Sequence, residues 1–149
     1  MLHDLFSNQI LWTTIASWAL AQFIKPFLEF LETRRWSWGL WFSSGGNPSS
    51  HSALVVSAML AIGLFDGFDT PVFALSVAIA MVVVYDAAGV RREAGKHAER
   101  INILIEELFS GMPISDKQLK EVIGHTPLEV MAGVLLGTAT AVTSYLLFG

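Results

Sequence analysis

Four apolar stretches constrain this chain more than any other feature of its sequence. They cover residues 5–24, 53–65, 73–85 and 126–148. The first is about 20 residues long, enough for a helix to cross a bilayer, and the second reaches that length only with the turn from Pro48. Hydrophobic residues make up 53% of the chain and charged residues 15%. The sequence therefore predicts one membrane-embedded domain over 1–149, an all-α bundle of about four transmembrane helices.

The segments between the stretches give further expectations. Pro26 should kink or end the first helix near Phe23, because proline lacks an N–H and clashes with the preceding turn. Three tryptophans at 36–41 are typical of an interfacial aromatic belt rather than of a binding cage. Residues 90–109 have the pattern of an amphipathic helix, which we expect on the cytoplasmic side of the bilayer core.

The stretch Gly45–Ser52 concentrates small, hydroxylic and titratable residues directly before the second apolar run. Pro48 suits the first position of a helix, and Asn47 before it suits the N-cap. The first helical turn would then present unpaired N–H groups and the positive end of the helix dipole, which together bind phosphate without a metal. The alternative is a polar loop that merely caps a helix.

Gly133 and Gly137 form a GxxxG pattern in the last apolar stretch. Such small residues let membrane helices approach closely. We predict that this face forms a homodimer, which Gly137→Leu would disrupt. The alternative is that the same residues pack against another helix of the chain.

Basic residues are concentrated in two of the loops, which the positive-inside rule places in the cytoplasm. They are Lys25, Arg34, Arg35, Arg91, Arg92, Lys96, Arg100, Lys117 and Lys120. With four spans, His51, Asp86 and His125 reach the same face as these cations. We therefore expect a cell (inner) membrane protein with its polar site on the cytoplasmic side.

The residue inventory excludes several kinds of chemistry. The chain has no cysteine, and its four histidines lack a metal-ligand spacing such as H-E-x-x-H. We therefore expect no metal, no cofactor and no nucleic-acid partner. His3 and His97 are interpreted as surface or interface residues.

Three ordered motifs carry a resemblance. Pro48–His51 resembles the Pro-Ser-Gly-His motif of the type 2 phosphatidic acid phosphatase superfamily, which includes vanadium-dependent haloperoxidases, and Gly124–Glu129 resembles its later His-x-x-x-Asp element. Tyr85–Lys96 and the small size point to the divergent bacterial and plant branch. Lys25 matches the lysine of the first motif, whereas Glu32 and Leu119 stand at positions where the superfamily has other residues.

The resemblance implies a metal-independent phosphatase that acts on a lipid phosphate or diphosphate through a phosphohistidine. His125 would be the nucleophile and His51 the general acid, with Glu129 holding the correct tautomer of His125. The implied phosphate site comprises Lys25, Ser49, Ser50, Arg91 and Arg92. Asp86, Arg34, Arg35 and Lys96 would form ion pairs or support the site.

Each of these roles has a structural alternative. Thr126 and Glu129 have the spacing of a capping box, which does not exclude a catalytic Glu129. His51 has the alternative of a buried capping residue, and Arg91 and Arg92 that of stop-transfer charges in contact with anionic lipid. The competing function is a non-enzymatic assembly or transport subunit that keeps the motifs as an anion or lipid-headgroup site.

Overall fold

The computed structural model describes residues 2–36, 38–42, 45–89, 97, 100–105, 108 and 126–149. Its elements are α1 (Leu2–Phe6), α2 (Gln9–Thr33), the 3₁₀ helix η1 (Trp38–Phe42), α3 (Ser50–Asp66), α4 (Pro71–Ala88) and α6 (Pro127–Phe148). All of these elements are helical, which confirms the all-α class for the described part of the chain. Most of the predicted amphipathic helix at 90–109 lies outside the described residues.

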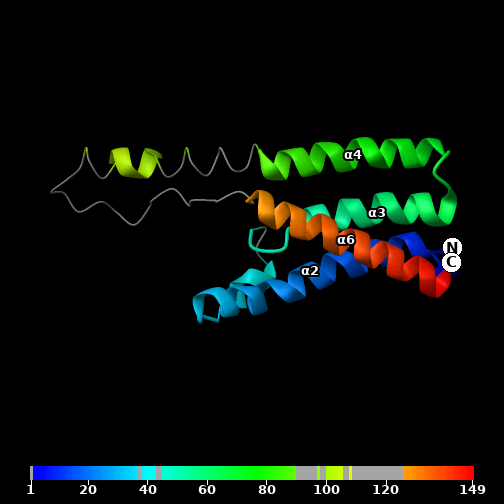
Figure 1. The fold of residues 1–149 in the computed structure, drawn as a ribbon, viewed down its shortest axis with the longest axis horizontal. Coiled ribbons are helices and arrows are strands. Elements are labelled where there is room, and N and C mark those ends of the chain that lie inside the picture. Colours follow the sequence, from blue (N-terminus) through cyan, green and yellow to red (C-terminus); the bar gives the residue numbers. More distant parts are fainter. Residues whose placement is uncertain are drawn as a thin grey trace.

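The four long helices lie side by side (Figure 1). Both chain termini and the turn between α3 and α4 are at one end of the bundle, which we call the terminal end. α3 and α6 begin at the opposite end, which we call the cavity end. α3, which begins within the Pro48–His51 motif, contacts α2, α4 and α6 and is therefore the centre of the bundle.

α3 and α6 pack closely because glycine occupies two positions of their interface. A Cβ atom on Gly133 would collide with the carbonyl oxygen of Ser49, and one on Gly137 would lie 2.6 Å from the carbonyl oxygen of Ala53. The GxxxG face is therefore used within the chain, as the alternative interpretation has it. The homodimer loses this support and stays a prediction.

α4 has a different character. Only Ala80 and Ala87 are buried in it, while Leu75, Met81 and Val82 are at least 61% exposed. Exposed apolar side chains along a whole helix are typical of a face that contacts lipid. Pro71–Ala88 and Pro127–Phe148 are long and apolar enough to cross a membrane, whereas α3 has 17 residues. Two candidate spans are thus present in the described residues, and the predicted count of four is not confirmed.

Local sequence signals explain several helix ends. Thr126 is an N-cap, as its capping-box spacing predicts, and Thr70 is another N-cap with proline at the next position. The chain turns after Asp66. Pro26 does not end the first helix, because α2 continues through it to Thr33, and the predicted kink stays a prediction. The ring of Pro26 is fully buried. Its packing offsets the hydrogen bond that proline removes from the helix.

Candidate functional site

Lys25 is the charged side chain that the fold buries most completely among the described residues. Only 1% of it is exposed, and its Nζ donates a hydrogen bond to Ser50 Oγ over 3.2 Å. A buried ammonium is unfavourable unless negative charge or polar partners surround it. The carboxylate of Glu129 supplies such a charge, since it interacts electrostatically with Lys25. The hydrogen bond joins α2 to α3, and Glu129 of α6 lines the same cavity as Lys25.

The start of α3 differs from the prediction. Ser49, and not Asn47, is the N-cap, and α3 begins at Ser50, two residues beyond Pro48. The Asn47–Pro48 peptide bond is cis. Several residues of this stretch have side chains that cap helices, so the sequence alone did not select one of them.

The hydroxyl groups of this turn have structural partners. Ser49 Oγ accepts hydrogen bonds from the Ser52 N–H (3.3 Å) and the Ser52 hydroxyl (3.0 Å). Ser49 and Ser50 are both at most 1% exposed. Their immediate role is therefore to hold the start of α3 against Lys25. His51 is half-buried in the first turn of the same helix.

The start of α6 is fixed by the predicted capping box. Thr126 Oγ1 accepts from the Glu129 N–H (3.3 Å), and Glu129 Oε2 accepts from the Thr126 N–H (3.2 Å). The carbonyl oxygen of Glu129 also accepts from the Ser49 N–H over 3.0 Å. The structural interpretation of Glu129 is thus confirmed. Its proposed partner His125 directly precedes Thr126 but lies outside the described residues, so the catalytic role of Glu129 stays a prediction.

A cavity of about 240 Å³ opens beside these contacts. Its lining residues are Lys25, Leu28, Glu29, Leu40, Gly46, Asn47, Thr126, Leu128 and Glu129. Lys25 and Glu129 were predicted as site residues, whereas Asn47 was predicted only as an N-cap and Glu29 was not predicted to belong to the site. The spacing of Glu29, four residues after Lys25, was a usable signal because such residues share a helix face. Gly46 has a φ of +88°, a conformation that favours glycine.

The charges of this cavity constrain its ligand. The described wall carries the two carboxylates of Glu29 and Glu129 against the one ammonium of Lys25. A dianionic phosphate would need more positive charge than this wall supplies. Asn47 Oδ1 is buried without a hydrogen-bond partner among the described residues, so an acceptor is available to a hydroxyl group or a water molecule. The predicted cations Arg91, Arg92 and Lys96 all lie outside the described residues.

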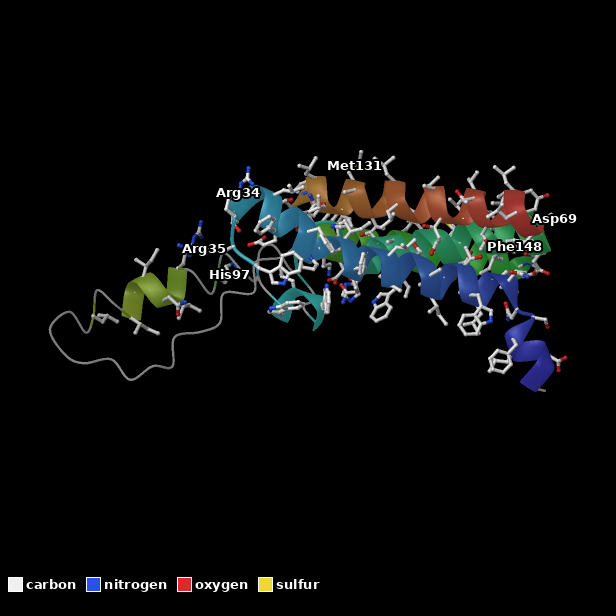
Figure 2. The ribbon with its side chains drawn as sticks, turned by 90° about the horizontal axis from the view of Figure 1, so that it is seen from below. Arg34, Arg35, Asp69, His97, Met131 and Phe148 are labelled. Carbon is white, nitrogen blue, oxygen red and sulfur yellow. The ribbon has the colours of Figure 1, made fainter. Side chains whose placement is uncertain are left out.

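The remaining predicted residues lie near the cavity end but do not line the cavity. Arg34 ends α2 with a φ of 57°, and its N–H donates to the Phe30 carbonyl oxygen. Arg34 and Arg35 are exposed at the opposite end of the bundle from Asp69 and Phe148 (Figure 2). Asp86 is half-buried near the end of α4. Their supporting roles stay predictions.

Comparison with known proteins agrees with the motifs. The family model described as the divergent PAP2 family matches residues 6–140. An uncharacterized membrane protein of Bacillus subtilis (strain 168), YuiD, is 38% identical over 145 residues, with 90% of this chain and 92% of YuiD covered. No solved structure matches the chain.

Proposed function

Because the chain belongs to the divergent PAP2 family, we propose that it is a membrane phosphatase acting on a lipid phosphate or diphosphate. The observation that carries the proposal is the buried Lys25, held by Ser50 at the point where α3 and α6 begin. A cation fixed beside two helix N-termini favours an anion at this position. A lysine buried only for stability is an improbable choice, since an apolar residue would fill its place at lower cost.

The proposed reaction proceeds in two steps. A neutral imidazole nitrogen of His125 attacks phosphorus, and the bond from phosphorus to the lipid oxygen breaks as His51 gives that oxygen a proton. A water molecule, giving its proton to His51, then attacks phosphorus and breaks the P–N bond, which releases phosphate and restores neutral His125. Lys25 and the helix N-termini offset the charge on the phosphoryl oxygens during both steps.

The net negative charge of the cavity wall suggests a role for cations outside the described residues. Since Glu29 and Glu129 outnumber Lys25 in the cavity, we propose that Arg91 and Arg92 supply the missing positive charge, with Lys96 in support. Arginine suits this task because its planar donors bind phosphate oxygens in pairs. Ser49 and Ser50 act in this proposal through Lys25 and the helix start that they hold in place.

The second candidate is a non-enzymatic membrane subunit with a lipid-headgroup site. The excess of carboxylates in the described wall favours it, because such a wall also suits a headgroup that carries hydroxyl or ammonium donors. In that case the motifs would bind a lipid without turning it over. The two candidates therefore differ in one measurable quantity, the release of phosphate.

A turnover experiment separates the candidates. Purified protein in mild detergent with EDTA is given phosphatidate, phosphatidylglycerophosphate or a polyprenyl diphosphate, and released phosphate is measured with and without vanadate. We expect release from at least one lipid and its inhibition by vanadate. The matched control is His97→Ala, which changes a histidine outside the motifs. Binding of these lipids without any release would instead identify the headgroup subunit.

We further propose that the cavity end faces the cytoplasm at the cell (inner) membrane, on the basis of the basic loops. Single cysteines at Ser44 and at Asp69 test this in intact cells with an impermeant thiol reagent. Only the cysteine at Asp69 should react from outside. Labelling at Ser44 alone would reverse the orientation.

A further inference from the structure

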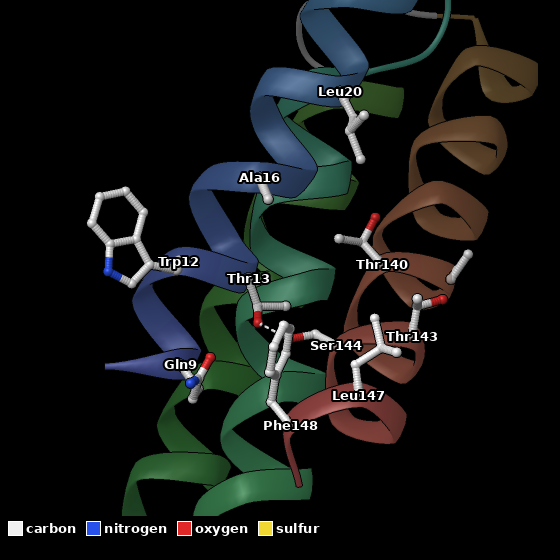
Figure 3. A pocket seen from close by; sticks show the side chains of 11 residues that line it. Gln9, Trp12, Thr13, Ala16, Leu20, Thr140, Thr143, Ser144, Leu147 and Phe148 are labelled. Atoms are coloured by element: carbon white, nitrogen blue, oxygen red, sulfur yellow. Dashed lines mark hydrogen bonds between the residues drawn. The ribbon is translucent and has the colours of Figure 1, made fainter. Parts of the chain in front are cut away.

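A second hollow lies in the terminal half of the bundle and shares no lining residue with the cavity. It is a groove of about 400 Å³ between α2 and α6 (Figure 3). Trp12, Ala16 and Leu20 of α2 line one wall, and Ala139 and Leu147 of α6 line the other. The proposed reaction uses none of these residues. The groove thus needs an explanation of its own.

Three of the four hydroxyl groups that line the groove have hydrogen-bond partners within the protein. Thr13 and Ser144 share a hydrogen bond of 2.5 Å across the two helices, visible as the dashed line in Figure 3. Thr140 Oγ1 donates to the Leu136 carbonyl oxygen over 2.8 Å, a bond within α6. The walls therefore offer mainly carbon surface to a ligand. A hydrocarbon chain matches this surface, whereas a polar ligand would leave its own donors and acceptors unpaired.

α2 and α6 both contribute to the groove and to the cavity, which Leu40, Gly46 and Asn47 also line. Lys25 and Glu129 line the cavity, whereas residues 9–20 and 139–148 line the groove. At about 1.5 Å of rise per residue, Leu20 lies about 7.5 Å and Trp12 about 20 Å from Lys25 along α2. Half of the hydrocarbon core of a bilayer is about 15 Å deep. If the phosphate of a lipid lies at Lys25, only a long tail therefore reaches the groove.

From these relations we propose that the groove between α2 and α6 seats the hydrocarbon tail of the lipid phosphate and selects its length. The proposal rests on the proposed function. It adds that the protein recognises the hydrocarbon tail of the substrate in addition to its phosphate. Short tails would end before Leu20 and gain nothing from the groove. Long tails would pack against Ala16 and Ala139, where small side chains leave room.

A substitution that fills the groove tests this selection. Ala16→Phe puts a ring into it, and Ala78→Phe on the exposed face of α4 is the matched control. The substrates share one phosphate head group and carry either a butyl or a long-chain tail. We expect Ala16→Phe to lower kcat/KM for the long-chain substrate by about tenfold, the lower end of what a hydrophobic pocket achieves by size. The value for the butyl substrate should not change.

Other outcomes of this experiment overturn the proposal. If Ala16→Phe lowers both values equally, the groove affects the fold or the chemistry instead of the tail. If it lowers neither, or if Ala78→Phe has the same effect, the groove does not select tails.

A binding measurement keeps the proposal testable even without turnover. The probe is a non-hydrolysable long-chain phosphonate with a photoreactive diazirine at the end of its tail, and the labelled peptides are identified by mass spectrometry. We expect labels within 9–20 and 139–148, reduced in Ala16→Phe. Labelling of the same peptides by a diazirine phosphatidylcholine with equal efficiency would show ordinary lipid contact. A crosslink between two copies through these helices would show a protein interface, and either result refutes the tail site.

If the phosphonate labels the groove but no lipid releases phosphate, the tail site stands and the phosphatase proposal fails. If phosphate is released but the groove is not labelled, the reverse holds. The two proposals can thus fail separately.

Discussion

The two ends of the bundle bury different kinds of polar groups. Towards the terminal end, Thr13 and Ser57 are neutral hydroxyls, and each has a partner in a neighbouring side chain or a helix carbonyl. At the cavity end Ser49 and Ser50 are buried hydroxyls as well, and the ammonium of Lys25 is buried beside them. Neutral hydroxyls are common between membrane helices, whereas a charge there is costly and is associated with function. The proposed function makes use of this difference, because it assigns packing to the hydroxyls of the terminal end and chemistry to the buried charge of the cavity end.

The largest effect should come from the two motif histidines. His125→Ala and His51→Ala should each lower turnover by at least ~10³-fold, on the order of 4 kcal/mol of barrier, because the nucleophile or the proton donor is lost. Thermal unfolding in detergent should stay near that of the wild type. Near-wild-type turnover in either variant would remove that residue from the mechanism.

Lys25→Met tests whether the buried charge serves chemistry or packing. Methionine has a similar length and no charge, so the bundle should keep or gain stability. Turnover should fall by about 10²-fold, since a group that stabilises the phosphoryl oxygens is lost. Both quantities are measured on the same preparation. A strong loss of thermal stability with unchanged turnover per folded molecule would make Lys25 a packing residue.

Gly133 lies towards the cavity end and Gly63 towards the terminal end, and substituting them tests how well the packing at each end adapts to an added side chain. A Cβ on Gly133 would strike the backbone of Ser49, whereas one on Gly63 would strike the ring of Phe68, which is free to shift. Gly133→Ala should therefore destabilise the protein by about 1–3 kcal/mol and Gly63→Ala by less. Gly39→Ala, with no atom within 4 Å of the new Cβ, is the control. Equal melting temperatures for Gly133→Ala and Gly39→Ala would contradict the close contact of α3 with α6.

Local signals made part of this structure predictable from the sequence. The capping box of Thr126 and Glu129 depends on neighbouring residues only, and it was predicted correctly. The GxxxG pattern indicated close packing but not its partner, because the partner depends on how the whole chain folds. The same holds for Lys25, whose position at the end of an apolar run indicated a membrane boundary. Its burial depends on the hydrogen bond to Ser50 and on the nearby charge of Glu129, and both residues are distant in the sequence.

Thr126→Ala and Thr70→Ala should have the smallest effect on stability, and they compare the two ends of the bundle most directly. Both threonines are N-caps followed by proline, and both accept a hydrogen bond from the third helical residue. Loss of either cap should cost about 1 kcal/mol of stability. Only Thr126 lies beside the cavity, where the capping box also holds the carboxylate of Glu129.

Turnover should therefore fall in Thr126→Ala and stay unchanged in Thr70→Ala, although both variants lose similar stability. Melting temperature and kcat/KM are measured for the two variants side by side, and Thr126→Ser, which keeps the capping oxygen, should restore turnover. Equal kcat/KM for the two alanine variants would mean that the start of α6 only caps a helix, and that the position of Glu129 does not matter to the reaction.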